Sequence, residues 1–219
     1  MKEKSFVSNL HTSTKRDYLQ RMTNDKVECM KIARKFEKEF WDGDRKYGYG
    51  GYKYIEGRWE KVVKALIKDY DLTNKSKILD VGCGKGYLLF DLKKELKEIE
   101  IHGYDISEYA IKNSHNEIKE NLFVHDASKK LKFPDNYFDL VISLGTLHNL
   151  EIQDLKNSIQ EIQRLGKKKY IMVESYRNEE ELFNLQCWAL TCKAFYSYDE
   201  WLWLYKNFGY TGDFEFIYF

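Results

Sequence analysis

Residues 78–89 read ILDVGCGKGYLL, in which one apolar run passes through a turn with three glycines into a second apolar run. Gly82, Gly84 and Gly86 stand at alternate positions. Glycine permits backbone angles that other residues avoid, and it lets a ligand lie directly against the main chain. The stretch therefore predicts a buried strand, a tight ligand-binding turn and the start of a helix.

Short apolar runs alternate with amphipathic segments from residue 76 onward. The runs predict strands at residues 77–81, 100–105, 121–126, 138–144 and 169–175. The segments between them predict helices at residues 86–98, 107–119 and 151–165. This alternation is typical of an α/β domain with a mainly parallel sheet and right-handed crossovers. Because ligands bind beyond the carboxyl ends of such strands, the candidate site residues are those that end or follow each run.

Acidic residues lie near the ends of the first three runs. Asp105 ends the second run about 20 residues after the turn, where its two oxygens suit a pair of ribose hydroxyls. Asp126 ends the third run, where it would accept from an adenine amino group while the amide of Ala127 donates to the ring. Asp80 stands just before the turn and suits an ammonium or sulfonium group. S-adenosylmethionine combines these three parts.

A nicotinamide or flavin dinucleotide is the competing interpretation of a glycine-rich turn. Such cofactors use the spacing G-x-G-x-x-G and place their pyrophosphate on the helix N-terminus. The spacing here is G-x-G-x-G, and Asp80 would repel a pyrophosphate. These residues favour S-adenosylmethionine over a dinucleotide.

Four motifs, ILDVGCGKG, GYDIS, HDAS and FDLVISLGTLHNL, resemble in order and spacing the cofactor motifs of class I S-adenosylmethionine-dependent methyltransferases, over roughly residues 76–175. The resemblance implies an α/β fold, with a Rossmann-like, mainly parallel sheet and helices on both faces. It implies S-adenosyl-L-methionine as cofactor and S-adenosyl-L-homocysteine as product. It places the methionine part near Gly82, Gly84 and Ser143 or Leu144. The cofactor-binding residues expected are Asp80, Gly82, Cys83, Gly84, Asp105, Ile106, Asp126, Ala127, Ser143 and Leu144.

The C-terminal part departs from this family pattern. Members usually complete the sheet with an antiparallel hairpin after the fifth strand, whereas GDFEFIYF at residues 212–219 predicts a single strand. A seventh strand is either short and placed between residues 176 and 212, or absent. Two aromatic-rich helical segments, LFNLQCWALTCKAF and YSYDEWLWLYKNFGY, occupy that interval. One of these two segments is expected to pack on the sheet. The first, LFNLQCWALTCKAF, is expected to roof the ligand pocket.

Charge and apolar content narrow the class of protein. The 219 residues carry 36 Lys and Arg against 35 Asp and Glu, a net charge of +1, so the basic excess of a dedicated nucleic-acid binder is missing. The start, MKEKSFVSNLHTSTKR, lacks the apolar core of a signal peptide, and no apolar stretch approaches the roughly 20 residues of a membrane span. The scattered cysteines have no zinc-site spacing and are expected to be free thiols: Cys29, Cys83, Cys187 and Cys192. The sequence therefore predicts a cytoplasmic protein that binds neither membrane, metal nor nucleic acid.

Residues 1–75 predict an N-terminal helical extension with a lid, ahead of a methyltransferase core at residues 76–219. Apolar spacing predicts one or two amphipathic helices within residues 14–41 and another from Trp59 to Ile67. Between them YGYGGYKY predicts a loop that folds over the cofactor cleft. Its phenols and a nearby guanidinium would donate to the methionine carboxylate or to an anionic substrate: Tyr47, Tyr49, Tyr52, Tyr54 and Arg58. The alternative is a tyrosine-rich turn packed on the outside of the fold.

His148, in GTLHNL after the fourth run, lies on the rim expected to face the transferred methyl group. It is either a general base, a group that positions the acceptor, or a structural histidine bonded to a loop carbonyl. The fifth run ends in VESYRN, which brings Glu174, Tyr176 and Arg177 to the same rim as candidate substrate-binding residues. They alternatively form an ordinary loop before a helix capped by Asn178. The other histidines are expected to be structural: His11, His102, His115 and His125.

A looser resemblance concerns the outer segments WDGDRKYGYGGYKY, VESYRN and GYTGDFEF. They look like stretches of bacterial small-molecule methyltransferases of surface-polysaccharide biosynthesis, which implies a sugar-linked or phosphate-like acceptor, such as the phosphoramidate of some capsules. The leading hypothesis is a small-molecule O-methyltransferase. The alternatives are a nucleic-acid methyltransferase, which the near-neutral charge opposes, and a non-catalytic partner subunit that only binds S-adenosylmethionine.

Overall fold

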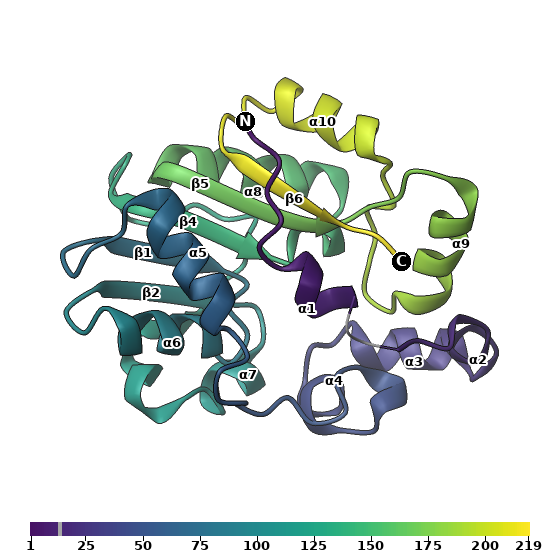
Figure 1. The fold of residues 1–219 in the computed structure, drawn as a ribbon. Helices are drawn as coiled ribbons and strands as arrows, with labels where there is room; N and C mark the ends of the chain where they lie inside the picture. Colours follow the sequence, from purple (N-terminus) through teal and green to yellow (C-terminus); the bar gives the residue numbers. More distant parts are fainter. Residues whose placement is uncertain (13–14) are drawn as a thin grey trace.

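A computed structural model describes residues 1–12 and 15–219, and at its centre lies a parallel sheet. The six strands follow the order β3-β2-β1-β4-β5-β6, and every neighbouring pair is parallel (Figure 1). The strands are β1 Lys77–Val81, β2 Glu100–Asp105, β3 Leu122–Val124, β4 Phe138–Leu144, β5 Gly166–Glu174 and β6 Asp213–Ile217. The strand order reverses at β1, which lies between β2 and β4. The mainly parallel α/β fold is confirmed, with its switch point at the carboxyl ends of these strands.

Helices cover both faces of the sheet because successive strand residues point to opposite sides. Ile78 packs in one buried cluster with residues of α5 and α6, whereas its neighbour Leu79 packs in a second cluster with residues of α8 and α10. The main helices are α5 Glu60–Tyr70, α6 Tyr87–Glu95, α8 Ile152–Leu165, α9 Glu179–Trp188 and α10 Tyr198–Asn207. Of the helices described, none is both long and apolar enough to cross a bilayer.

The expected helix over residues 107–119 is divided in two. It forms α7 (Glu108–Lys112) and the 3₁₀ helix η2 (Asn116–Asn121). The division falls at His115, whose backbone is extended and whose amide donates to the carbonyl of Lys85 (3.2 Å). This bond outside the helix ties the segment to the glycine turn.

The region of residues 14–41 holds three short described helices in place of the expected one or two; residue 14 itself lies outside the described residues. These helices are α2 Tyr18–Thr23, α3 Lys26–Ala33 and α4 Lys38–Asp42. Asp25 (φ 46°) and Phe36 (φ 52°) adopt the left-handed conformation, which a continuous helix does not tolerate. The helix predicted around Trp59 to Ile67 is confirmed as α5.

The edge of the sheet departs from the family pattern. In the described part of the chain, β6 pairs directly and in parallel with β5, and no antiparallel strand is inserted. The N-terminal residues run along β6 (Figure 1). The amide of Lys4 donates to the carbonyl of Phe214 (2.7 Å), and the amide of Phe214 donates to that of Lys2 (3.1 Å). The start of the chain thereby satisfies backbone groups that an open edge would leave unpaired.

Glu215 of β6 fixes the chain that follows. Its buried carboxylate accepts hydrogen bonds from the amides of Phe6 (2.7 Å), Val7 (3.0 Å) and Ser8 (2.6 Å), and from the hydroxyl of Tyr170. These bonds place the first turn of the short helix α1 (Ser8–Thr12) beside the carboxyl ends of β5 and β6.

Candidate active site

The glycine turn between β1 and α6 is fixed to the end of β2. The amide of Gly82 donates to the carbonyl of Tyr104 (2.8 Å), and the amide of Gly84 donates to Asp105 Oδ2 (2.9 Å). Gly82 has a φ of 78°, and a Cβ there would lie 2.0 Å from Thr146 Oγ1. Only glycine fits, so the turn holds the ends of β1 and β2 together with the loop after β4.

Two carboxylates lie beside the turn. Asp105 accepts from the amides of Gly84 and Ser107 (both 2.9 Å); burial raises the pKa of Asp105, and these hydrogen bonds oppose the rise. Asp80 is only 4% exposed, and its carboxylate has no hydrogen bond to any described residue. Burial and the nearby charge of Asp105 raise the pKa of Asp80 to about 8. Since a buried carboxylate without a partner favours a cation, the turn fits the ammonium group of an amino acid.

The predicted adenine-binding residues lie at the ends of β2 and β3. The amide of His125 donates to the carbonyl of Asp105 (3.0 Å), which draws Asp126 and Ala127 toward the end of β2. Ile106 is exposed next to Asp105, so its side chain is open to a ligand face. These four positions are compatible with an adenosyl group laid across the strand ends.

Two other predicted cofactor residues have structural contacts. The hydroxyl of Ser143 is fully buried and donates to the carbonyl of Val81 (3.0 Å), so it joins β4 to β1. Cys83 lies against the backbone of Gly103, and burial raises the pKa of its thiol. Leu144, the residue after Ser143, lines a cavity instead.

Trp41, which is not among the predicted site residues, lies against the glycine turn. Its ring comes within 2.9 Å of the position that a Cβ of Gly84 would occupy. The indole nitrogen donates to Ser107 Oγ (2.9 Å), and the ring stacks on Tyr49 with centroids 5.3 Å apart. The end of α4 and the tyrosine loop therefore cover the turn.

A partly buried ion pair holds this cover in place. The ammonium group of Lys85, within the glycine turn, lies 2.7 Å from Asp42 Oδ2 and donates to the carbonyl of Tyr52 (2.8 Å). Tyr109 of α7 also donates to Asp42 (2.8 Å). Burial opposes ionisation of Asp42, but the hydrogen bonds from Lys85 and Tyr109 lower its pKa. The cover is thus attached to the turn by a charged contact.

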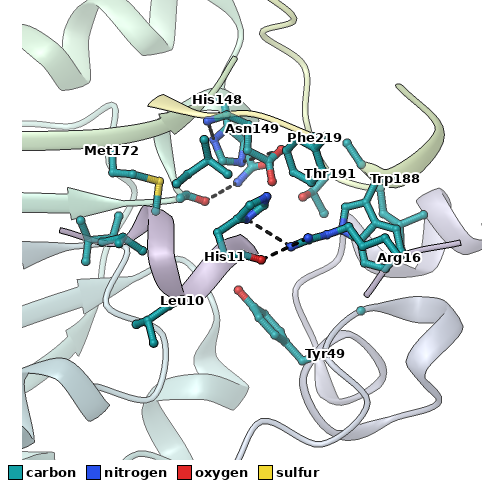
Figure 2. A pocket seen from close by; sticks show the side chains of 18 of the residues that line it. Leu10, His11, Arg16, Tyr49, His148, Asn149, Met172, Trp188, Thr191 and Phe219 are labelled. Atoms are coloured by element: carbon teal, nitrogen blue, oxygen red, sulfur yellow. Dashed lines mark hydrogen bonds and ion pairs between the residues drawn. The ribbon is translucent and has the colours of Figure 1, made fainter. Parts of the chain in front are cut away.

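A cavity of about 360 Å³ adjoins the carboxyl ends of β4 and β5 (Figure 2). It is enclosed by α1, the tyrosine loop, the strand ends and the chain that follows α9. Six of the predicted site residues line it: Tyr49, Tyr52, Arg58, Leu144, His148 and Glu174. Tyr49 connects the cavity with the glycine turn, because its hydroxyl lies within the electrostatic influence of both Glu174 and Asp105.

The other four predicted substrate residues lie outside this cavity. Tyr54 donates to Asp91 (2.6 Å) on α6, and Tyr47 packs against the buried cluster of α3. Asn178 caps α9 as the alternative interpretation expects, accepting from the amide of Glu181, and Arg177 pairs with Glu181. Tyr176 and Arg177 instead line a shallow depression beside Tyr218 and Glu3.

His148 uses both of its ring nitrogens. Nδ1 accepts from the amide of Glu174 (3.2 Å), so the proton of the neutral ring belongs on Nε2, which lies 3.5 Å from Glu174 Oε2. Burial lowers the pKa of His148, although Glu174 opposes the shift. The ring is therefore neutral near pH 7 and has no free lone pair for a substrate proton. This geometry favours a positioning role over a general base.

His11 lies in the cavity wall, whereas the sequence predicts a structural role for it. Arg16 Nη2 lies 3.2 Å from His11 Nδ1 (Figure 2). Because a guanidinium only donates, Nδ1 is the acceptor and Nε2 carries the proton. Burial and the charge of Arg16 lower the pKa of His11 to about 4, and a hydrogen bond with the backbone of Tyr218 opposes the shift. His11 is thus a neutral part of the cavity wall, held by Arg16 and by the backbone of Tyr218.

Three arginines that are not among the predicted site residues also line the cavity: Arg16, Arg21 and Arg45. Arg16 precedes α2, Arg21 belongs to α2, and Arg45 begins the 3₁₀ helix η1 (Arg45–Tyr47). The many charges of these segments are typical of ordinary solvated surface. With Arg58 they set four cations against one carboxylate, Glu174, among the described side chains of the wall. The cavity is therefore strongly basic, although the whole chain is nearly neutral.

The sequence is similar to several known proteins. It is 33% identical over 122 residues to the mitochondrial arginine-hydroxylase NDUFAF5 of Rattus norvegicus, covering 56% of this chain and 33% of that protein. It is 27% identical over 115 residues to the demethylmenaquinone methyltransferase of Thermotoga maritima, covering 52% and 48%. The chain spans about a third of the length of its NDUFAF5 relative.

Two solved structures have a similar fold. An S-adenosylmethionine-dependent methyltransferase from Archaeoglobus fulgidus superposes with a TM-score of 0.52 at 26% identity, over 68% of each chain. The YcgJ protein of Bacillus subtilis superposes with a TM-score of 0.53 at 18% identity, over 67% of this chain and 66% of that one, which bears on the fold alone. The family described as a methyltransferase domain matches residues 72–209. Since this match covers more than half of the sequence, the chain belongs to the methyltransferase-domain family with the class I, Rossmann-like fold.

Proposed function

We propose that this protein transfers a methyl group from S-adenosyl-L-methionine to an oxygen of a small anionic acceptor. The observation that carries the proposal is the basic cavity next to the glycine turn, in which four arginines face one glutamate among the described wall residues. His11 and His148 add no charge near pH 7, since the pKa of each is lowered. A formal side-chain charge of +3 favours an anionic ligand over a neutral one.

The cofactor would be held by the turn and the strand ends. Asp80 would face its ammonium group, Asp105 its ribose hydroxyls, and Asp126 with Ala127 the edge of its adenine. When bound, it supplies an electrophilic methyl group. Trp41 and Tyr49 cover the turn and would exclude water from it.

The chain's own residues would orient the acceptor oxygen. Methyl transfer requires mainly that this oxygen be held in line with the methyl group, at about 3 Å. Burial and the nearby Glu174 raise the pKa of Tyr49 to about 12, so its phenol remains a donor between the two parts of the site. A hydroxyl acceptor must also lose a proton, and Glu174 is the carboxylate positioned to take it. His148 would hold Glu174 in place through its two contacts.

A sugar-linked or phosphate-like acceptor of surface-polysaccharide biosynthesis is the finer form of the proposal. This acceptor class is supported by the resemblance of the outer segments and by the basic wall of the cavity. It does not rest on any of the relatives named above. Methylation of nucleic acid is opposed by the near-neutral net charge. A purely binding subunit is opposed by the side chains of His11, His148 and Glu174 that face the cavity.

The test is to incubate the purified protein with S-adenosylmethionine and a panel of sugars, sugar phosphates and nucleic acids, and to measure S-adenosylhomocysteine. We expect turnover with phosphorylated small molecules, and we expect the product to be about 14 Da heavier than the acceptor. A gain of about 16 with arginine-containing substrates would instead align the chain with its hydroxylase relative. Absence of any S-adenosylhomocysteine binding would contradict the proposal.

A further inference from the structure

Three arginine side chains surround the ring of Trp188 at one end of the cavity. The guanidinium carbons of Arg16, Arg21 and Arg45 lie 5.3, 5.0 and 5.3 Å from the ring centroid. All four residues line the cavity. Because they share one ring, the three cations are gathered in a small volume, which we name the arginine cluster.

Neutral backbone carbonyls hold the cluster in position. Arg21 Nη1 donates to the carbonyls of Arg45 (2.9 Å) and Lys46 (3.0 Å), and Arg45 Nη1 donates to that of Gly48. Within residues 1–12 and 15–219, neither Arg21 nor Arg45 forms an ion pair with a carboxylate. The carbonyls fix the directions of the Arg21 and Arg45 guanidinium groups without neutralising the charge of either.

Gathering these charges has a physical cost. Burial and the neighbouring charge of Arg45 lower the pKa of Arg21, and burial also lowers that of Arg16. Both effects oppose the charged forms that the cluster holds together. An anion placed among the guanidinium groups would remove this repulsion and occupy donors that the carbonyls do not use.

The number of cations indicates the kind of anion. A carboxylate carries one negative charge, whereas a phosphate monoester carries roughly 1.5 to 2 near pH 7 and presents three acceptor oxygens. Guanidinium groups match phosphate geometry with paired N–H donors.

The cluster lies apart from the place of methyl transfer. Its residues belong to the region of α2, η1 and the end of α9, whereas Met172, His148 and Asn149 belong to the strand ends (Figure 2). In Figure 2, Arg16 and Trp188 lie across the cavity from Met172. A group bound by the cluster would therefore be an anchor and not the reacting atom.

We propose that the arginine cluster binds the phosphoryl group of the acceptor, and that a different oxygen of the same molecule receives the methyl group. The second half of this inference, methylation of another oxygen of the same molecule, rests on the proposed function. The first half, the binding of a phosphoryl group, stands independently of methyl transfer.

The test measures binding of inorganic phosphate and of glucose 1-phosphate by calorimetry at constant ionic strength, with glucose and acetate as comparison ligands. We expect the two phosphates to bind at least tenfold more tightly than glucose or acetate. Arg45→Gln should weaken phosphate binding at least tenfold, whereas Arg34→Gln, a change at an exposed arginine outside the cavity wall, should leave it unaltered. Arg21→Lys, which retains the charge but loses the paired N–H donors, should weaken phosphate binding less than Arg21→Gln does.

Binding of S-adenosylhomocysteine to each variant separates the two proposals and checks folding. We expect it to be unchanged in Arg45→Gln, and we expect phosphate to bind equally well with and without it. Equal phosphate binding in wild type and Arg45→Gln would overturn the site. Competition between phosphate and S-adenosylhomocysteine would overturn its role as an anchor. Phosphate binding without any S-adenosylhomocysteine binding would leave the site intact and refute the methyltransferase proposal.

Discussion

The carboxylate of Asp80 makes cofactor binding depend on pH in a defined direction. In the free protein its pKa is about 8, raised by burial and by Asp105. An ammonium group beside it would return the pKa toward its ordinary value of 3.8, so binding favours the ionised form. Below pH 8 the free protein must first release a proton. Affinity for S-adenosylhomocysteine should therefore rise about tenfold per pH unit, or roughly 1.4 kcal/mol, from pH 6 toward pH 8 and then level off.

Calorimetry in two buffers of different ionisation enthalpy measures both the affinity for S-adenosylhomocysteine and the number of protons released on binding. We expect about one proton to be released per cofactor bound at pH 6.5 and fewer at pH 8.5. Asp80→Asn should bind the cofactor about tenfold more weakly at pH 8 and lose the pH dependence between pH 6 and 8. A flat affinity profile in the wild type, or the same slope in Asp80→Asn, would refute the reasoning.

The same shift has a consequence for stability. A carboxyl with a raised folded pKa destabilises the free protein progressively as pH rises from the ordinary value of 3.8 toward 8. Asp80→Asn should therefore raise the Tm of the free protein at pH 8 by about 3 °C or more, and the difference should vanish near pH 4. An unchanged Tm at pH 8 would show that the Asp80 carboxyl does not destabilise the free protein.

Four further substitutions test other parts of the site. Asp105→Ala should weaken S-adenosylhomocysteine binding by roughly 1–3 kcal/mol through lost charge-assisted bonds, and unchanged affinity in calorimetry would contradict the ribose assignment. With a hydroxyl acceptor, Glu174→Gln should lower kcat about a hundredfold and His148→Ala about tenfold. Cofactor affinity should remain nearly intact in both variants. A loss in His148→Ala as large as that in Glu174→Gln would indicate that His148 is itself the general base. Lys85→Met should loosen the cover by removing its contact with Asp42, seen as faster hydrogen exchange in residues 41–54; unchanged exchange would contradict the attachment.

The central fold could be predicted from the sequence because its signals are local. Each strand is a short apolar run, and Gly82 and Gly84 mark the turn at which a ligand meets the backbone. The predicted runs match the strands closely, except that β3 is limited to Leu122–Val124 and β5 begins earlier, at Gly166. The helix before β1 and those after β1 and β4 were likewise predictable from apolar spacing.

The cavity could not be predicted, because contacts between distant segments build it. Arg21 reaches the carbonyls of Arg45, Lys46 and Trp188, which lie up to 167 residues away in sequence. His11 enters the wall because Glu215 fixes the chain just before it. No local pattern distinguishes these cations from solvated surface charges. The tyrosine loop was only partly predictable, since Tyr49 and Tyr52 line the cavity while the phenol of Tyr54 turns to Asp91.

The crystal structure of the protein with S-adenosylhomocysteine tests the central claim most directly. The account predicts ribose hydroxyls within hydrogen-bond distance of Asp105, the ammonium group beside Asp80, and the sulfur facing the cavity that contains Glu174. The ligand bound among Arg16, Arg21 and Arg45 instead, or absent from the glycine turn at saturating concentration, would contradict it.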